Sequence, residues 1–263
     1  MEKKPKVAIL SGFGINCQIE TSHAFSLAGA EAKIIHLNDF LCGEEHFSNY
    51  HCIAFPGGFS FGDDISSGKV YGNKIRTRLW DQLLEFIDEE KLIIGICNGF
   101  QTLVKIGLLP NISGTFTQEA TLFSNASGRF EDRWVYLTAN PKSRCIFTKG
   151  ITRLYLPVRH GEGQFIVEKK EIKTKLKDDG YICLQYTDSK GNLAPYPSNP
   201  NGSEENIAGI CDKTGRIFGL MPHPECHIFF HHHPRWTRGE GGREIMGINI
   251  FENAVRYMKG ELL

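Results

Sequence analysis

Short apolar runs alternate with stretches of helical periodicity through the first hundred residues. Apolar runs of strand length occupy residues 7–10, 33–37, 52–55 and 92–96. The stretches between them carry apolar residues at helical spacing, notably residues 17–28, residues 71–87 and the residues just after 97. Nearly all-apolar strands that alternate with amphipathic helices are typical of a parallel sheet covered on both faces. We therefore predict an open, mostly parallel α/β sheet with helices on both faces.

The second half of the chain has a different pattern, with little helical periodicity. Strand-like segments are predicted at residues 115–123, 130–138, 154–167, 181–187, 207–210 and 217–220. Residues 191–203 are rich in Pro, Asn, Gly and Ser and predict a surface loop, and residues 244–258 predict a closing amphipathic helix. Because no repeat or linker is evident, we predict a single domain over residues 1–263, with an antiparallel β extension on the α/β sheet.

Composition excludes some classes of partner. Thirty basic residues balance thirty acidic ones, so net charge favours neither nucleic acid nor an anionic membrane as partner. No apolar run approaches the roughly 18 residues that span a bilayer. The eight cysteines form no C-x-x-C pair, and we interpret most of them as small buried hydrophobic residues in a reducing compartment. These features together predict a cytoplasmic protein.

One cysteine stands in a setting that suits a nucleophile. Residues 95–99 read G-I-C-N-G, follow an apolar strand and precede a helix, which is the cysteine version of the G-x-S-x-G elbow. Such a turn presents Cys97 at the carboxyl end of the sheet and at a helix N-terminus, whose dipole favours a thiolate. A buried structural cysteine is the alternative reading of this turn.

A second motif lies far along the chain. Residues 221–225 read M-P-H-P-E and follow the apolar run 217–220. In an extended segment His223 and Glu225 point to the same side, so the glutamate can orient the histidine as a general base. Alone, this motif is equally compatible with a turn that carries a surface carboxylate. Together with Cys97 it predicts a Cys-His-Glu triad, in a chain order that differs from that of the α/β hydrolases.

Acyl transfer also needs donors for an oxyanion. The backbone N–H of Asn98 follows the nucleophile and is well placed by the logic of the elbow. A second donor is expected from Gly57 or Gly58, at the end of the predicted strand 52–55, where glycine lets the main chain approach a substrate. A tight turn is the alternative role of these glycines, and both roles can hold together.

These motifs resemble those of the class I (triad) glutamine amidotransferases. Residues 95–101 match the G-x-C-x-G-x-Q elbow of that class, and residues 223–225 match its late H-P-E. Within the class the chain is similar to the glutaminase subunits of phosphoribosylformylglycinamidine synthase, and the similarity runs from about residue 6 to residue 225. The further segments that carry it are residues 56–60, 160–163, 199–203 and 206–210.

The resemblance implies a reaction and partners. Glutamine would bind beside Cys97 and form a γ-glutamyl thioester, and the ammonia would pass to a large synthetase subunit that uses ATP and Mg²⁺, with a small PurS-like subunit as a further partner. It implies no cofactor on this chain. By motif position Gln101 would hold the glutaminyl chain, while His160 and Gly161 would line the site or the route to the partner.

The chain departs from this family pattern in its first loop and after H-P-E. Residues 13–17 lack the proline of the family loop, and Cys226 stands where arginine is common. Residues 226–242 form an unusually long segment. Its Cys226, His227 and three histidines at 231–233 invite a metal interpretation, but adjacent histidines point in different directions. We therefore predict no metal here, and a surface or interface segment whose residues 234–236 pack on a partner.

Two other functions remain as alternatives. The chain could be the glutaminase of another amidotransferase or a free-standing amidohydrolase, which the segments at 160–163 and 199–203 argue against. It could instead be an inactive module that regulates or scaffolds a synthetase. Retention of Cys97, His223 and Glu225 argues against that alternative.

Overall fold

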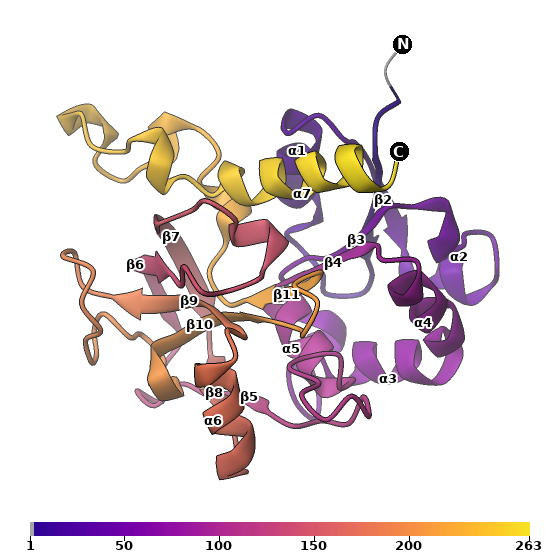
Figure 1. The fold of residues 1–263 in the computed structure, drawn as a ribbon, viewed down its shortest axis with the longest axis horizontal. Coiled ribbons are helices and arrows are strands. Elements are labelled where there is room, and N and C mark those ends of the chain that lie inside the picture. The colour runs from indigo at the N-terminus through magenta and orange to yellow at the C-terminus, as the bar shows by residue number, and fades with distance from the viewer. Residues whose placement is uncertain (1–2) are drawn as a thin grey trace.

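A nine-stranded mixed sheet forms the centre of the computed structural model, which describes residues 3–263 (Figure 1). The first two residues of the predicted domain lie outside the described part. The strand order is β2-β1-β3-β4-β11-β10-β9-β6-β7. These strands are β1 Lys6–Ser11, β2 Glu31–His36, β3 Cys52–Phe55, β4 Leu92–Ile96, β6 Glu131–Ala139, β7 Arg153–His160, β9 Ile182–Thr187, β10 Ile207–Cys211 and β11 Ile217–Leu220.

The sheet has a parallel part and an antiparallel part, as the sequence predicts. Strands β2, β1, β3, β4 and β11 pair in parallel, whereas β10, β9, β6 and β7 continue the sheet in antiparallel pairs. Strands β5 Thr121–Ser124 and β8 Glu162–Ile166 form a separate antiparallel pair. The parallel strands β3 and β4 are buried along their whole length, which explains why their sequences are almost entirely apolar.

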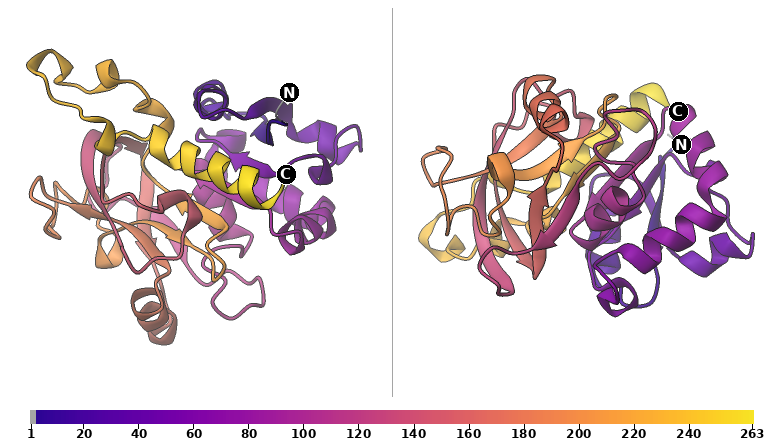
Figure 2. Two further views of the ribbon diagram at one scale, coloured as in Figure 1. Left: turned by 45° about the horizontal axis from the view of Figure 1, so that its top comes forward. Right: turned by 90° about the horizontal axis from the view of Figure 1, so that it is seen from below.

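Helices cover both faces of the parallel part. The helices are α1 Gln18–Leu27, α2 Leu37–Leu41, α3 Lys69–Arg78, α4 Trp80–Asp88, α5 Asn98–Lys105, α6 Lys170–Asp178 and α7 Ile248–Glu261. Helices α1 and α7 contact each other on one side of the sheet, and α3 and α5 contact each other on the opposite side (Figure 1). Figure 2 shows α7 lying across the junction between the parallel and the antiparallel parts.

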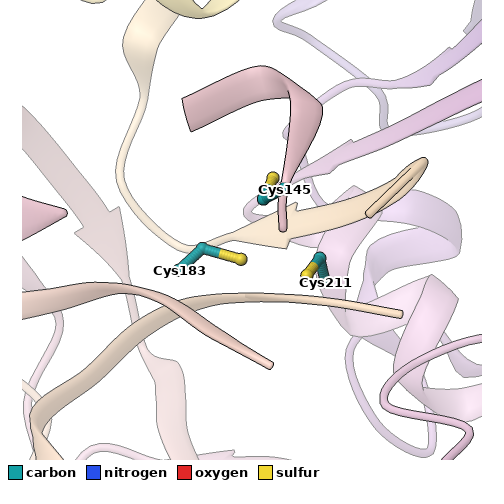
Figure 3. A group of neighbouring side chains, drawn as sticks. All are labelled: Cys145, Cys183 and Cys211. Carbon is teal, nitrogen blue, oxygen red and sulfur yellow. The ribbon is translucent and has the colours of Figure 1, made fainter. Parts of the chain in front are cut away.

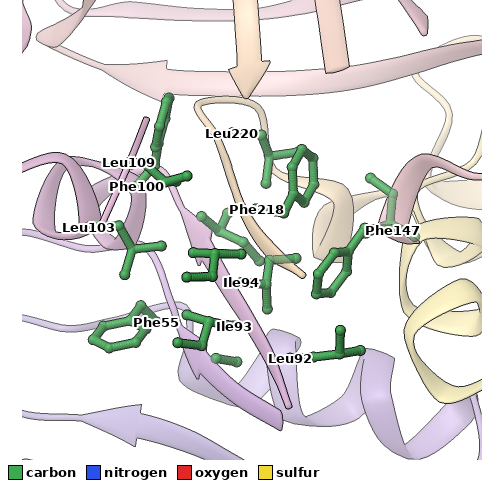
Figure 4. Close-up of a cluster of buried hydrophobic side chains, with 14 of the residues drawn as sticks. Phe55, Leu92, Ile93, Ile94, Phe100, Leu103, Leu109, Phe147, Phe218 and Leu220 are labelled. Carbon is green, nitrogen blue, oxygen red and sulfur yellow. The ribbon is translucent and has the colours of Figure 1, made fainter. Parts of the chain in front are cut away.

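The core is built around the strands that lead to Cys97. Ile93, Ile94, Phe218 and Leu220 are fully or almost fully buried and lie beside Phe100 of α5 (Figure 4). Burial of one such side chain contributes about 1.5–3 kcal/mol to folding. The end of β4 is therefore a rigid platform for the residues that follow it.

The predicted helix 71–87 is two helices, and the prediction of one helix is wrong. Leu79 has φ −127° and ψ 10°, so the chain changes direction between α3 and α4. Leu79 nevertheless remains buried, and the guanidinium of Arg76 stacks on the ring of Trp80 across the break. The predicted apolar stripe is thus largely correct, because two short helices can bury it on the same core.

The predicted strand 154–167 is also divided. It turns at Gly161 and becomes β7 and β8, which belong to different sheets. Of the predicted strand 115–123, only the end is regular, as β5. The sequence analysis missed helix α6, a lysine-rich segment in which Leu176 alone is buried, because so narrow an apolar face gives a weak periodic signal.

Part of the predicted surface loop 191–203 is buried, which corrects that prediction. Asn201 is fully buried, and Asn199 and Ser203 are nearly so. The hydroxyl of Ser203 donates to Oδ1 of Asn201 at 2.7 Å and the amide of Asn201 donates to the hydroxyl of Tyr186 at 3.2 Å. Polar loop residues can be buried here because they satisfy one another.

None of the helices within residues 3–263 combines the length and the apolar character needed to cross a membrane.

Candidate active site

Cys97 occupies the sharp turn between β4 and α5. Its backbone has φ 50° and ψ −105°, a strained conformation for a residue with a side chain. A Cβ on Gly99 would lie 1.9 Å from the carbonyl oxygen of Phe55, and a Cβ on Gly95 would lie 2.8 Å from the Gly99 backbone. Glycine is therefore required on both sides of the turn, as the G-x-C-x-G pattern predicts.

The thiol of Cys97 lines a small cavity of about 120 Å³. Its side chain is 4% exposed, and its Sγ lies 3.7 Å from the carbonyl oxygen of Arg159. The residues around this cavity are Asn16, Cys17, Gly58, Phe59, Cys97, Phe130, Arg159 and His223. A larger cavity of about 580 Å³, beside residues 195–206, contains none of the predicted catalytic residues.

His223 and Glu225 form a buried pair. Nδ1 of His223 lies 2.6 Å from Oε1 of Glu225, and both side chains are at most 3% exposed. The expectation of an extended segment is only partly correct. His223 is extended, but Pro224–Cys226 forms a 3₁₀ turn. The two side chains meet because that turn folds the glutamate back toward the ring.

The electrostatics of His223 favour the imidazolium form. Burial lowers the pKa of His223, but the charge of Glu225 and the neighbouring thiols of Cys97 and Cys17 outweigh burial and raise it well above 6.5. Nε2 of His223 has no hydrogen-bond partner among the described residues. In the imidazolium, the proton on Nδ1 faces the carboxylate of Glu225, so the proton on Nε2 is the one available for transfer.

Gly57 is the point at which the strand ends converge. A Cβ placed there would lie 2.7 Å from Cε1 of His223, 3.3 Å from Sγ of Cys17 and 3.5 Å from Cβ of Cys97. Strand β3 leads to Gly57, β4 leads to Cys97 and β11 precedes His223, and these strands pair in parallel. The carboxyl ends of three strands thus bring together residues that are far apart in sequence.

The predicted oxyanion donors lie beside this point. The carbonyl of Gly57 accepts hydrogen bonds from the N–H groups of Asn16 and Cys17, so the N–H of Gly58 in the same trans peptide points away from them. Gly58 has φ 151°, and a Cβ there would lie 2.6 Å from the carbonyl oxygen of Gly14. Asn98 is the first residue of α5, where a backbone N–H has no acceptor within the helix.

The side chain of Asn98 has a separate, structural position. It is fully buried, donates to Asp63 at 2.8 Å and to Oε1 of Gln101 at 3.0 Å, and accepts from the N–H of Ser60 at 3.3 Å. It therefore holds the loop after β3 against the start of α5. This contact fixes Gly57 and Gly58 relative to Cys97.

Gln101, His160 and Gly161 do not line the cavity. Gln101 donates to the carbonyl of Glu162 at 2.5 Å, and Nδ1 of His160 lies 3.0 Å from Oδ1 of Asn125. Burial, together with the nearby His223, lowers the pKa of His160 to about 3, so this ring is neutral. A Cβ built on Gly161 would lie 3.8 Å from Cδ2 of Phe130. The predicted substrate contacts of these three residues stay predictions.

Sequence reasoning missed Arg159 and two phenylalanines. Arg159 is the one permanently charged residue among those described around the cavity, and its Nη2 lies 3.0 Å from Sγ of Cys226. Phe59 and Phe130 stack at 6.3 Å between ring centroids and are about half exposed. Arg159 directly precedes the H-G-E-G segment, which is the signal that could have found it.

Residues 226–242 are only partly at the surface. His227 and His233 are buried against Trp134 and Tyr155, which corrects the expectation of a surface segment for these two residues. Nδ1 of His227 lies 2.8 Å from the carbonyl of Tyr155. Trp236 is 46% exposed and begins the short 3₁₀ turn Trp236–Arg238 in the segment before α7. Its packing on a partner stays a prediction.

Comparisons with known proteins give the family. Residues 4–258 match the family model described as "CobB/CobQ-like glutamine amidotransferase domain". The chain is 47% identical to the PurQ subunit of phosphoribosylformylglycinamidine synthase of Methanococcus maripaludis, over 96% of this chain and 97% of that one. It is 48% identical to the PurQ subunit of Dehalococcoides mccartyi, over 97% and 98% of the two chains. The chain belongs to this family of glutamine amidotransferase subunits.

Solved structures agree with that family. A structure of PurLQS from Thermotoga maritima has a chain that matches with a TM-score of 0.73 and 29% identity, over 97% of this chain and all of that one. A glutamine amidotransferase from Thermotoga maritima matches with a TM-score of 0.51 at 15% identity, which shows a shared fold alone. The mostly parallel sheet with helices on both faces is thus the amidotransferase fold.

Proposed function

We propose that this chain hydrolyses glutamine to glutamate and ammonia at Cys97. The ammonia passes to a synthetase subunit that converts formylglycinamide ribonucleotide to formylglycinamidine ribonucleotide in purine synthesis. One observation carries the choice of residues: Cys97 stands in a strained elbow on a cavity shared with His223, whose ring is held by Glu225 at 2.6 Å. The family and the names of its relatives support the reaction.

The proposed first step is attack by the Cys97 thiolate on the side-chain amide carbon of glutamine. The N–H groups of Gly58 and Asn98 stabilise the negative oxygen of the tetrahedral intermediate. The imidazolium of His223 gives its proton to the departing nitrogen, ammonia leaves, and a γ-glutamyl thioester remains. Because Glu225 favours the imidazolium, this proton is available at neutral pH.

The proposed second step regenerates the Cys97 thiolate and the imidazolium of His223. Neutral His223 takes a proton from water, the resulting hydroxide attacks the thioester carbon, and glutamate departs from the sulfur. Nε2 of His223 has no competing hydrogen-bond partner in the described chain, so it is free for both transfers. The same ring thus serves as acid and then as base.

Arg159 is proposed to hold the α-carboxylate of glutamine. Its recorded hydrogen bonds within the described residues reach sulfur atoms, those of Cys226 and Cys17, rather than a carboxylate. Burial raises the pKa of Cys226 to about 12, so that neighbour is a neutral thiol. The guanidinium charge is therefore available to a bound carboxylate at the cavity, where a bidentate contact suits its geometry.

The partners follow from the relatives. The structural relative is a PurLQS assembly, and we propose that this chain likewise docks on a large synthetase subunit with a small PurS-type subunit. ATP and Mg²⁺ are assigned to the synthetase subunit. Free cysteines and a role in purine synthesis both suit a cytoplasmic location.

The experiment that tests this function uses the reconstituted complex. Cys97→Ala is expected to lower glutamine-dependent synthesis by at least about a thousandfold while ammonia-dependent synthesis stays within about twofold. Cys52→Ala is the matched control, because Cys52 is buried in β3 away from the cavity. Glutamine-dependent turnover that survives in Cys97→Ala would show that another residue is the nucleophile.

A further inference from the structure

Three cysteines converge at a place that the glutaminase mechanism does not use. Cys145 directly precedes the 3₁₀ turn Ile146–Thr148, Cys183 lies in β9 and Cys211 ends β10 (Figure 3). Their sulfur atoms all lie within 4.8 Å of one another, and the three side chains are at most 2% exposed. Figure 3 shows Cys183 and Cys211 extending toward the space between the three residues, below Cys145.

This cluster lies away from Cys97. Cys211 is paired with Phe218 of β11, whereas Leu220, at the other end of β11, is paired with Ile96 and accepts from the N–H of Cys97. The cluster is therefore displaced toward the opposite end of the sheet. It belongs to the antiparallel part, and none of its members is among the residues around the catalytic cavity.

A hydroxyl accompanies the three sulfurs. Oγ of Ser143 lies 3.4 Å from Sγ of Cys183 and 3.9 Å from Sγ of Cys211. Three thiols and one hydroxyl, supplied by three separate elements, make a set of four donor atoms. Three of these donors are sulfur, which is a soft ligand. Thiolates select Zn²⁺, Cu⁺ or iron–sulfur centres over hard cations such as Mg²⁺.

The charges around the cluster are compatible with a bound cation. No lysine, arginine or histidine within residues 3–263 is recorded donating to these sulfurs. Three buried thiolates would need a positive charge beside them, and a bound divalent cation would supply it.

We propose that Cys145, Cys183 and Cys211 form a structural site for a thiophilic metal ion, with Ser143 as the fourth donor. The ion would be bound by three thiolates, releasing their protons to solvent, and Zn²⁺ is the cation that fits a four-coordinate sulfur-rich set. This departs from our expectation that the chain binds no metal. That expectation considered residues 226–242, because cysteines at 145, 183 and 211 show no motif spacing.

The consequence would be a fixed connection between the sheet and the last helix. The turn at Ile146–Thr148 follows Cys145, and the amide of Asn253 in α7 donates to the carbonyls of Phe147 and Lys149 at 3.0 and 2.8 Å. Metal at the cluster would anchor this turn, and with it α7, to β9 and β10. Removal of the metal should then lower the free energy of unfolding markedly and change glutamine turnover much less.

Zinc binding to the full-length, untagged protein tests the proposal. Cys17, His223 and Glu225 also place potential ligand atoms within 4.8 Å of one another, so the titration uses a Cys17→Ala background. Metal-free, reduced protein is titrated with Zn²⁺ without oxygen, in competition with a chromophoric chelator. We expect one equivalent to bind, and Cys183→Ala to weaken it at least about a hundredfold. Cys52 is another fully buried cysteine, and Cys52→Ala should change the zinc affinity less than about twofold.

X-ray absorption by zinc in the Cys17→Ala protein leaves the three cysteines of the cluster intact. This measurement therefore does not depend on whether the cluster variants fold. Three sulfur neighbours at about 2.3 Å are expected in the first shell. Absence of a stoichiometric zinc ion, equal affinity in Cys183→Ala and Cys52→Ala, or a first shell of nitrogen and oxygen would each overturn the proposal. The three cysteines would then be small apolar core residues only.

Discussion

Nη2 of Arg159 lies 3.0 Å from Sγ of Cys226, although Arg159 is the last residue but one of β7 and Cys226 follows the H-P-E motif. Arginine is common after H-P-E in the class that this sequence resembles, and this chain has a cysteine there. The structure places a guanidinium beside that cysteine from another strand. The position of positive charge near His223 is therefore set by the fold and not by the motif.

Substitution of Arg159 separates binding from chemistry. Arg159→Gln in the complex is expected to raise KM for glutamine about 10–100-fold, because one charge-assisted contact is lost, with a smaller effect on kcat. Arg153→Gln, on the same strand but stacked on Tyr136, is the matched control. Steady-state glutaminase kinetics check this. A fall in kcat at unchanged KM would mean that Arg159 acts on the thiols and not on substrate.

Glu225 is expected to control the charge of His223. Glu225→Gln keeps the size of the side chain but removes the charge that raises the pKa of His223. We predict a 10²–10⁴-fold fall in kcat, roughly the range found when the acid of a triad loses its charge. Glu244→Gln, at an exposed position before α7, should leave kcat within about twofold. Equal activity in the two variants would remove Glu225 from the mechanism.

Covalent labelling identifies the nucleophile directly. The glutamine analogue 6-diazo-5-oxo-norleucine should attach to Cys97 and to none of the other seven cysteines, with peptide mass spectrometry as the readout. Labelling should be faster in the complex than in the isolated chain if docking completes the site. Modification of Cys17, whose sulfur is also near His223, would instead assign the reaction to that thiol.

Gly99 tests the steric basis of the elbow. Gly99→Ala would place a Cβ 1.9 Å from the Phe55 carbonyl oxygen, and we expect a loss of several kcal/mol in the free energy of unfolding. Gly260→Ala, in α7 with no atom within 4 Å of its built Cβ, should instead stabilise the protein by about 0.5–1 kcal/mol. Denaturant unfolding measures both changes. A tolerated Gly99→Ala would show that the turn can relax.

The buried His227 should make stability depend on pH. Burial lowers its pKa from 6.5 to about 4, so the unfolded chain binds the proton more tightly and stability rises with pH across this interval. As pH falls from 6.5 to 4, the His227 contribution should fall by roughly 2 kcal/mol. His227→Gln should flatten this part of the profile, whereas the exposed His46→Gln should not. Parallel profiles for all three proteins would contradict the prediction.

Local patterns in the sequence were sufficient for much of the fold and for the predicted triad. The apolar runs at β3 and β4 reflect burial on both faces of the sheet. The glycines around Cys97 reflect a turn with no room for side chains. The break at Leu79 and the division of residues 154–167 were not predictable this way. Those features depend on which neighbours each segment meets, and residue periodicity does not encode them.

The sequence by itself determined which residues we propose for the chemistry, because Cys97, His223 and Glu225 lie in motifs whose spacing suits those roles. Only the tertiary structure placed Arg159 beside the same cavity and brought Cys145, Cys183 and Cys211 within 4.8 Å. The reason is physical: strands that pair in a sheet bring together residues separated by tens of positions. Such contacts leave no periodic or motif signal along the chain.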